Sequence, residues 1–230
     1  MTDPNTHRGL FIVLEGPDGA GKSVQARRLA DRLIAQGLPV TYSREPGGTD
    51  LGEQVRHIVN DPGPTPRGPK ADVLLYSAAR AQHVDEVIRP ALESGWIVVL
   101  DRYATSTMAY QGYGSGVDLE LLTRIQDWAT GGLQPQLVIL LDVSAQTGLA
   151  RRKAGSAEEL TRWEDESRHD LAFHQRVREG YLEMAGSDPE RWIVLDGGGT
   201  IDEVAVDVGR AVDAVLLQSG IHDAAGEVVG

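Results

Sequence analysis

The stretch LFIVLEGPDGAGKS, residues 10–23, joins a short apolar run to a glycine-rich loop. Leu10–Glu15 is almost continuously hydrophobic, which is typical of a strand covered on both faces of a sheet. Gly16–Ser23 matches the pattern G-x-x-x-x-G-K-[ST], and a segment with helical spacing follows it. A strand, this loop and a helix in that order predict a phosphate-binding loop in an α/β fold.

The residue types of this loop explain why the pattern binds phosphate. Glycines let successive backbone N–H groups converge on phosphate oxygens, and the helix N-terminus adds its partial positive charge. We expect Lys22 to reach the β- and γ-phosphates of ATP, and the Ser23 hydroxyl to hold Mg²⁺. The predicted nucleotide-binding residues are Gly16, Pro17, Asp18, Gly19, Ala20, Gly21, Lys22, Ser23 and Val24.

Four more apolar runs resemble the first strand in composition. Helical segments separate them, and the last segment, from residue 201, has apolar residues along one stripe and acidic residues opposite. This alternation predicts a three-layer, doubly wound α/β fold with about five parallel strands. The further predicted strands are Val40–Arg44, Trp96–Asp101, Leu137–Asp142 and Trp192–Asp196.

Length and charge limit the class of protein. The 230 residues fit one domain, and a net charge of −12 argues against nucleic acid or an anionic membrane as the main partner. Because the chain has no cysteine, disulfides, thiolate zinc sites and a cysteine nucleophile are excluded. The first residues contain no apolar run of signal-peptide length, so we expect a cytoplasmic protein.

Three kinds of segment fall outside the alternation of strands and helices. Asp61–Pro69 is rich in proline and glycine and is expected to be an exposed connector. Residues 151–166 join a basic cluster to a small-residue hinge, which we interpret as a lid. Residues 1–8 and about 219–230 lack periodicity and are expected to be disordered tails.

The phosphate-binding loop by itself does not distinguish kinases from GTPase switches or nucleic-acid translocases. The chain has no N-K-x-D guanine motif. Asp196–Gly199 formally fits D-x-x-G, but it follows the last strand, where we expect it only to turn the chain into the final helix. The chain is also small and acidic for a nucleic-acid motor, so a kinase is favoured.

Further motifs occur in a specific order along the chain. They are REPGGT at 44–49, LLYSAAR at 74–80, DRY at 101–103, AYQG at 109–112 and LTRWEDES at 160–167. Together with the phosphate-binding loop, they resemble the thymidylate kinase family, dTMP kinases of the P-loop nucleoside-monophosphate kinase fold. The resemblance implies transfer of a phosphoryl group from ATP-Mg²⁺ to dTMP, a step in dTTP synthesis, by a homodimer.

The resemblance also implies which residues bind the acceptor nucleotide. Tyr76 matches the aromatic residue that stacks on thymine, and Arg80, four residues later, shares its helix face. Arg102 matches the arginine that grips the acceptor phosphate, while Arg56 is either a further phosphate contact or a solvated side chain. The implied acceptor residues are Asp18, Glu45, Pro46, Arg56, Tyr76, Arg80, Arg102, Thr107, Tyr110 and Gln111.

Two roles at the reacting centre follow from the same resemblance. Asp101 is either an indirect partner of Mg²⁺, beside Ser23, or an anchor for Arg102. The arginine that stabilises the transition state comes from the loop or from the lid in this family, and Pro17–Ala20 holds no basic residue. Arg162 is therefore the first candidate, and Arg152 and Lys153 stay open. The implied catalytic residues are Asp18, Lys22, Arg102, Arg151 and Arg162.

Other functions are compatible with parts of this pattern. The nearest alternative is a kinase for another nucleoside monophosphate or small acceptor. A nucleotide-dependent switch would carry the same loop without transferring phosphate to an acceptor. An inactive paralogue acting as a scaffold is disfavoured, because Asp18, Lys22, Ser23 and Arg102 are all present.

Overall fold

The computed structural model describes residues 5, 8–61, 67–154 and 170–219. Five parallel strands form one sheet in the order β2-β3-β1-β4-β5, as expected from the apolar runs. The lid beyond Ala154 and most of both tails lie outside the described residues. The strands are β1 (Leu10–Glu15), β2 (Val40–Arg44), β3 (Ile97–Asp101), β4 (Leu137–Asp142) and β5 (Trp192–Asp196).

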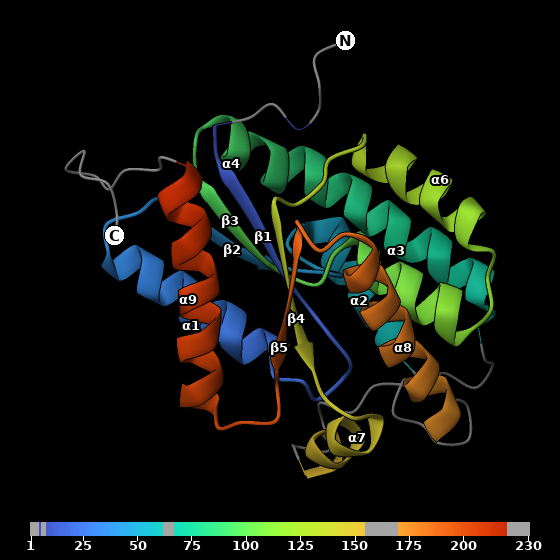
Figure 1. The fold of residues 1–230 in the computed structure, drawn as a ribbon. Helices are drawn as coiled ribbons and strands as arrows, with labels where there is room; N and C mark the ends of the chain where they lie inside the picture. The colour runs from blue at the N-terminus through green and yellow to red at the C-terminus, as the bar shows by residue number, and fades with distance from the viewer. Residues whose placement is uncertain (1–4, 6–7, 62–66, 155–169, 220–230) are drawn as a thin grey trace.

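Helices cover both faces of the sheet (Figure 1). Two π-helical segments, η1 and η2, interrupt the α-helical ones and were not expected from the sequence. The helical elements are α1 (Lys22–Ala35), α2 (Asp50–Asn60), α3 (Pro69–His83), η1 (Val84–Ile88), α4 (Arg89–Glu93), α5 (Ala104–Thr107), η2 (Met108–Gly114), α6 (Leu119–Thr130), α7 (Ala145–Ala154), α8 (Leu171–Ser187) and α9 (Ile201–Ser219).

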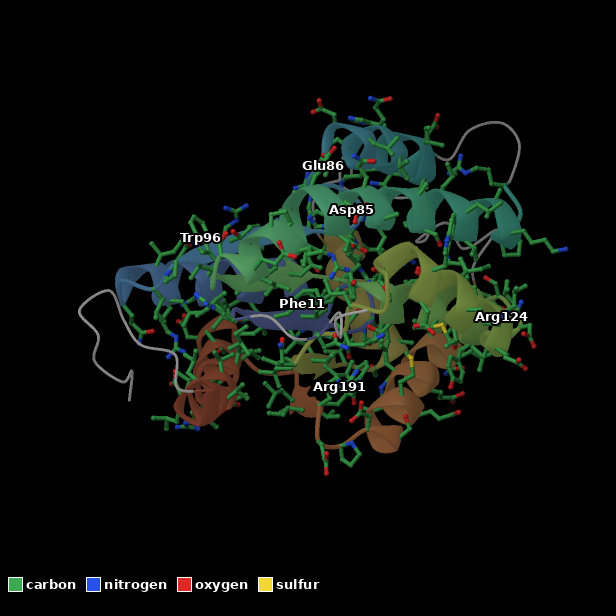
Figure 2. The ribbon with its side chains drawn as sticks, turned by 90° about the horizontal axis from the view of Figure 1, so that it is seen from above. Phe11, Asp85, Glu86, Trp96, Arg124 and Arg191 are labelled. Carbon is green, nitrogen blue, oxygen red and sulfur yellow. The ribbon has the colours of Figure 1, made fainter. Side chains whose placement is uncertain are left out.

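Alternate residues of β1 enter different cores. Leu10 and Ile12 pack with α1 and α9 on one face, whereas Phe11 and Val13 pack with η1 and α4 on the other. Figure 2 shows Phe11 in the middle of the layers, and its side chain is fully buried. A central strand buried on both faces holds the loop that follows it on a rigid base.

Small differences from the expected pattern have local causes. Strand β3 begins one residue late, because the Trp96 N–H bonds to Ala91 in the preceding turn. Ile201, at the start of the apolar stripe expected in the last helical segment, is more than half exposed, whereas Val204 and Val208 in the same segment are buried. The end of the proline-rich connector is anchored, since Arg67 donates to the Val59 carbonyl and pairs with buried Asp72.

Within the described ranges, no helix is long and apolar enough to cross a membrane.

Candidate active site

A cavity of about 750 Å³ opens at the carboxyl ends of β1 and β3. This edge is where α/β sheets place their ligands, because loops from neighbouring strands meet there. Most of the site residues expected from the sequence line it, as does the open candidate Arg152, and Asn60 and Ser106 are additions. The lining residues are Asp18, Gly19, Gly21, Lys22, Ser23, Val24, Glu45, Pro46, Arg56, Asn60, Tyr76, Arg80, Asp101, Arg102, Ser106, Thr107, Tyr110, Gln111, Arg151 and Arg152.

The glycines of the phosphate-binding loop serve two purposes. Gly19 and Gly21 have positive φ angles of 75° and 92°, which side chains rarely tolerate. A Cβ on Gly19 would come within 2.1 Å of the Gly148 carbonyl oxygen, and a Cβ on Gly148 within 2.2 Å of the Asp18 carbonyl oxygen. The backbone of α7 therefore packs directly against the loop. A Cβ on Gly21 would meet no described atom within 4 Å, so the loop has open space there.

Lys22 is buried beside the loop and is folded onto its backbone. Its Nζ donates to the Pro17 carbonyl at 2.7 Å. Burial first, and then the positive charge of Arg102, lower the pKa of Lys22 to about 8. The ammonium group therefore lies at the cavity wall with little solvation, where a polyphosphate would stabilise its charged form.

Ser23, at the start of α1, and Asp101, at the end of β3, form a pair of oxygen-bearing side chains. The Ser23 hydroxyl donates to Asp101 Oδ2 at 2.5 Å. Asp101 Oδ1 is buried and has no hydrogen-bond partner among the described residues. Hydroxyl and carboxylate oxygens suit Mg²⁺, so these residues fit a magnesium ion. In the described part of the chain no hydrogen bond joins Asp101 to Arg102, which favours the magnesium-side interpretation of Asp101.

Arg102 lies where the phosphate-binding loop meets the rest of the cavity. Its guanidinium bonds to Asp18 and, at 3.1 to 3.3 Å, to the hydroxyls of Ser106, Tyr110 and Tyr181. Burial opposes its charge, but neighbouring Tyr110 and Asp18 hold the pKa of Arg102 well above its ordinary value. Arg102 is therefore positively charged and faces the position where an anionic group would meet the loop.

Asp18 carries the opposite charge at the same place. Burial raises the pKa of Asp18, but the charges of Arg102 and Lys22 outweigh burial and bring it below the ordinary value. The carboxylate is consequently ionised at neutral pH and available to accept a hydrogen bond.

Arg80 is more deeply buried than Arg102. Four of its five N–H groups are engaged by the Glu45 carboxylate, the Thr107 hydroxyl, the Gln126 side chain and the Tyr103 carbonyl. One Nη2–H is left without a described partner on a side chain that lines the cavity. Arg80 is therefore fixed in the cavity wall, with a single N–H group available to a ligand.

The remaining acceptor candidates line the same side of the cavity. Gln111 is 2% exposed, and its Nε2 has no described hydrogen-bond partner. Tyr110 lies under the Arg102 guanidinium, and half-buried Tyr76 borders two hydrophobic clusters. Arg56 is half-buried and donates to the Pro46 carbonyl at 3.1 Å, so it is not a solvated side chain. Thr49, a weaker candidate, instead caps α2 by accepting from the Gly52 N–H.

Comparison with known proteins decides the family. The thymidylate kinase family model matches residues 14–208. The chain belongs to the thymidylate kinase family. Curated thymidylate kinases from Roseiflexus sp. (strain RS-1) and Deinococcus radiodurans are 48% and 49% identical over 214 and 206 residues, covering 90% and 89% of this chain. The alignments cover 95% and 97% of those two relatives.

The fold of the thymidylate kinase family agrees with the observed sheet. The crystal structure of thymidylate kinase from Ehrlichia chaffeensis superposes with a TM-score of 0.72 at 29% identity. The superposition covers 89% of this chain and 98% of that structure. The expected P-loop nucleoside-monophosphate kinase fold is thereby confirmed.

The two arginines at the basic end of α7 lie in different places. Arg151 donates to the carbonyls of Gly197 and Gly198 at 2.7 and 3.0 Å, which joins α7 to the loop after β5. Arg152 is half-buried at the cavity, and its charge contributes to the lowered pKa of Asp18. Arg162 lies outside the described residues.

Glu15, which is buried behind the cavity lining, is a residue that sequence reasoning missed. It is fully buried and accepts from the Tyr103 N–H, from the hydroxyls of Thr105 and Tyr181, and from both the N–H and the hydroxyl of Ser106. Two of these hydroxyls also contact Arg102. An acidic residue at the end of an otherwise apolar strand was the available signal, because a buried carboxylate requires such partners.

Proposed function

We propose that the cavity is the site at which this chain transfers the γ-phosphoryl group of ATP to dTMP, giving dTDP and ADP. Family membership supports the reaction. The meeting of the phosphate-binding loop with Arg102 at one cavity is the observation that supports the site. An oxygen of the acceptor phosphate attacks the γ-phosphorus, that P–O bond forms, and the bond to the β-phosphate oxygen breaks with ADP as leaving group.

On the donor side, the loop and Lys22 bind the phosphates of ATP. Gly19 and Gly21 line the cavity, with open space beside Gly21, and the start of α1 adds its partial positive charge. Lys22 moves from the Pro17 carbonyl to a phosphate oxygen, which is a stronger partner for an ammonium group.

Ser23 and Asp101 would hold Mg²⁺, directly and through water respectively. The unpartnered Asp101 oxygen beside the Ser23 hydroxyl is the support for this assignment. When bound, the ion supplies positive charge that neutralises the phosphate oxygens of the nucleotide.

On the acceptor side, Arg102 binds the phosphate of dTMP and Tyr76 stacks on thymine. Arg80, through its remaining N–H, and Gln111, through its unpartnered amide nitrogen, bond the polar edge of the base. Thr107 and Tyr110 face the deoxyribose. Catalysis is chiefly positioning and charge neutralisation, since the acceptor is already anionic.

The lid supplies the cation that stabilises charge on the transferring group. Arg162 stays our first candidate by resemblance. Arg151 bonds to Gly197 and Gly198 in the loop after β5, which favours a role for Arg151 at the base of ATP. The charge of Arg152 acts on Asp18, which favours a position for Arg152 nearer the reacting phosphates.

A homodimer and a cytoplasmic location complete the proposal. Helices α2, α3 and α6 lie side by side (Figure 1) and carry large apolar side chains with exposures up to 86%. They are Leu51, Ile58, Leu74, Leu121 and Trp128. Sedimentation should give a dimer for the native chain and a monomer for Trp128→Glu; a native monomer would refute this part.

Both substrates are charged nucleotides, which supports a cytoplasmic location, and cell fractionation tests it.

Coupled ADP release with ATP-Mg²⁺ and a panel of acceptors tests the function. We expect strong turnover with dTMP, weaker turnover with dUMP, and background with guanylate, deoxynucleosides and shikimate. ADP release that is equal without any acceptor would replace the kinase by a switch or an ATPase. A preference for another acceptor would keep the chemistry and change the substrate.

A further inference from the structure

A buried chain of polar side chains runs outside the cavity on its acceptor side. The Ser43 hydroxyl lies 2.8 Å from His83 Nε2, and His83 Nδ1 lies 3.3 Å from Glu45 Oε1. The other oxygen of Glu45 accepts from Arg80 Nε at 2.7 Å. All four side chains are buried, and the exposure of His83 is 0%. We call Ser43, His83, Glu45 and Arg80 the acceptor relay.

The chemistry of the partners determines the direction of the bonds to Glu45 in the acceptor relay. Arg80 only donates and the Glu45 carboxylate accepts, so Glu45 receives hydrogen bonds from both neighbours. His83 therefore carries a proton on Nδ1, and the Ser43 hydroxyl, which can both donate and accept, pairs with Nε2. Both ring nitrogens of His83 are satisfied in this arrangement.

The acceptor relay ends on residues that face the ligand. Glu45 and Arg80 both line the cavity, whereas His83 is not among the described lining residues. From Arg80 the bonds continue to Thr107, another lining residue, and to Gln126. A shift of the imidazole would therefore be passed to Glu45 and from there to the donor that Arg80 presents.

The same imidazole shapes the loop that follows β2. A Cβ on Gly48 would come within 2.5 Å of both His83 Nε2 and the Ser43 hydroxyl oxygen. Gly48 also has a positive φ of 77°. The REPGGT loop thus folds directly over His83, and the loop includes Pro46 of the cavity wall.

We propose that His83 is a positioning residue for the acceptor nucleotide: it orients Glu45, and through Glu45 sets Arg80 and the Pro46 wall, without contacting substrate. The inference rests on the proposed function, because it assumes that dTMP occupies this side of the cavity. Its consequence is selective. Loss of the His83–Glu45 bond weakens dTMP binding and leaves ATP binding unchanged, since none of the described relay bonds reaches the phosphate-binding loop.

Two substitutions at His83 test the two ring nitrogens separately, because each keeps the hydrogen bond of only one of them. His83→Asn places an amide nitrogen near Nδ1 and keeps a donor for Glu45, whereas His83→Gln places its amide near Nε2 and keeps only the Ser43 side. Ser43→Ala removes the far hydroxyl and is the mildest change to the relay. The readouts are KM for dTMP and for ATP, kcat, dTMP affinity measured calorimetrically without ATP, and the melting temperature.

We expect His83→Gln to raise KM and Kd for dTMP about tenfold, with KM for ATP changed by less than about twofold. His83→Asn should recover most of the loss, and Ser43→Ala should have the smallest effect. Equal effects on both substrates, or equal effects of Asn and Gln, would overturn the inference and leave His83 a packing residue. If the His83 variants fail to fold, Ser43→Ala must still raise KM for dTMP selectively, and an unchanged KM refutes the inference. Failure of the native chain to use dTMP would instead refute the proposed function.

Discussion

The donor and acceptor halves of the cavity are built from different parts of the chain. The donor half is mostly backbone: glycines 16, 19 and 21 form the loop, and Gly148 of α7 packs against it without a side chain. The acceptor half is a wall of side chains, in which Arg80 is locked by four hydrogen bonds to buried groups. Adding a Cβ to a glycine should therefore damage the donor half, whereas deleting a polar side-chain group should damage the acceptor half.

Two glutamates extend this contrast to the groups behind the wall. Glu45 is paired with a cation, Arg80, and this ion pair is buried. Glu15 accepts only from uncharged donors, and two of them, the hydroxyls of Ser106 and Tyr181, also contact Arg102. Arg80 is consequently held by a buried carboxylate, whereas Arg102 pairs with the less buried Asp18 and with hydroxyls that can turn when a phosphate arrives. Under the proposed function, the first arrangement faces a neutral base and the second an anionic phosphate.

The largest effect is expected from Arg80→Ala. It leaves the Glu45 carboxylate buried without its cation, so the free energy of unfolding should fall by about 3–5 kcal/mol. Urea denaturation measures this change, with Arg210→Ala, at an exposed surface pair, as a control that should alter little. A variant as stable as the native chain would show that the acceptor wall does not depend on this ion pair.

The next effect concerns Arg102, at the seam of the two halves. Arg102→Lys keeps the charge but loses the fork of donors, so kcat/KM for dTMP should fall about 100-fold with little change in melting temperature. Steady-state kinetics with dTMP varied at saturating ATP provides the number. Unchanged kinetics would mean that a point charge is sufficient and that Arg102 does not bind phosphate through two N–H groups.

Gly148→Ala tests the backbone character of the donor half. Its Cβ would force α7 away from the Asp18 carbonyl, so KM for ATP should rise about tenfold while KM for dTMP changes less. Gly186→Ala is the matched control, since that helical glycine has no described atom within 4 Å of the added Cβ. If both variants behave alike, the contact between α7 and the loop carries no function.

The two halves also differed in how far the sequence predicted them. The strand and the helix on either side of the donor loop were predicted because they belong to one continuous motif, and the five strands because continuous burial gives a strong local pattern. The acceptor relay was not predicted: Ser43 and Glu45 lie about forty residues from His83, and no local pattern pairs them. Glu15 likewise meets Tyr181 only through the fold. Polar networks of this kind are specified by tertiary packing, which periodicity does not encode.

The smallest expected effect is the uptake of a fraction of a proton when ATP binds. It tests whether the donor half uses Lys22 as an electrostatic contact. Because the pKa of Lys22 in the free chain is about 8, much of the side chain is neutral at pH 8.5. Binding of a polyphosphate favours the charged form and raises that pKa, so ATP binding must take up protons. Uptake should approach about three quarters of a proton at pH 8.5 and about one quarter at pH 7.5.

The sign of this linkage distinguishes Lys22 from other groups. Proton uptake that grows with pH means that ATP affinity falls as pH rises above 8, opposite to the trend expected if the phosphates of ATP were the titrating group. Calorimetry in two buffers of different ionisation enthalpy measures the uptake, and Lys22→Arg, which keeps the charge but does not titrate here, should abolish it. Uptake that persists in Lys22→Arg would assign the proton elsewhere and leave the donor half with backbone contacts alone.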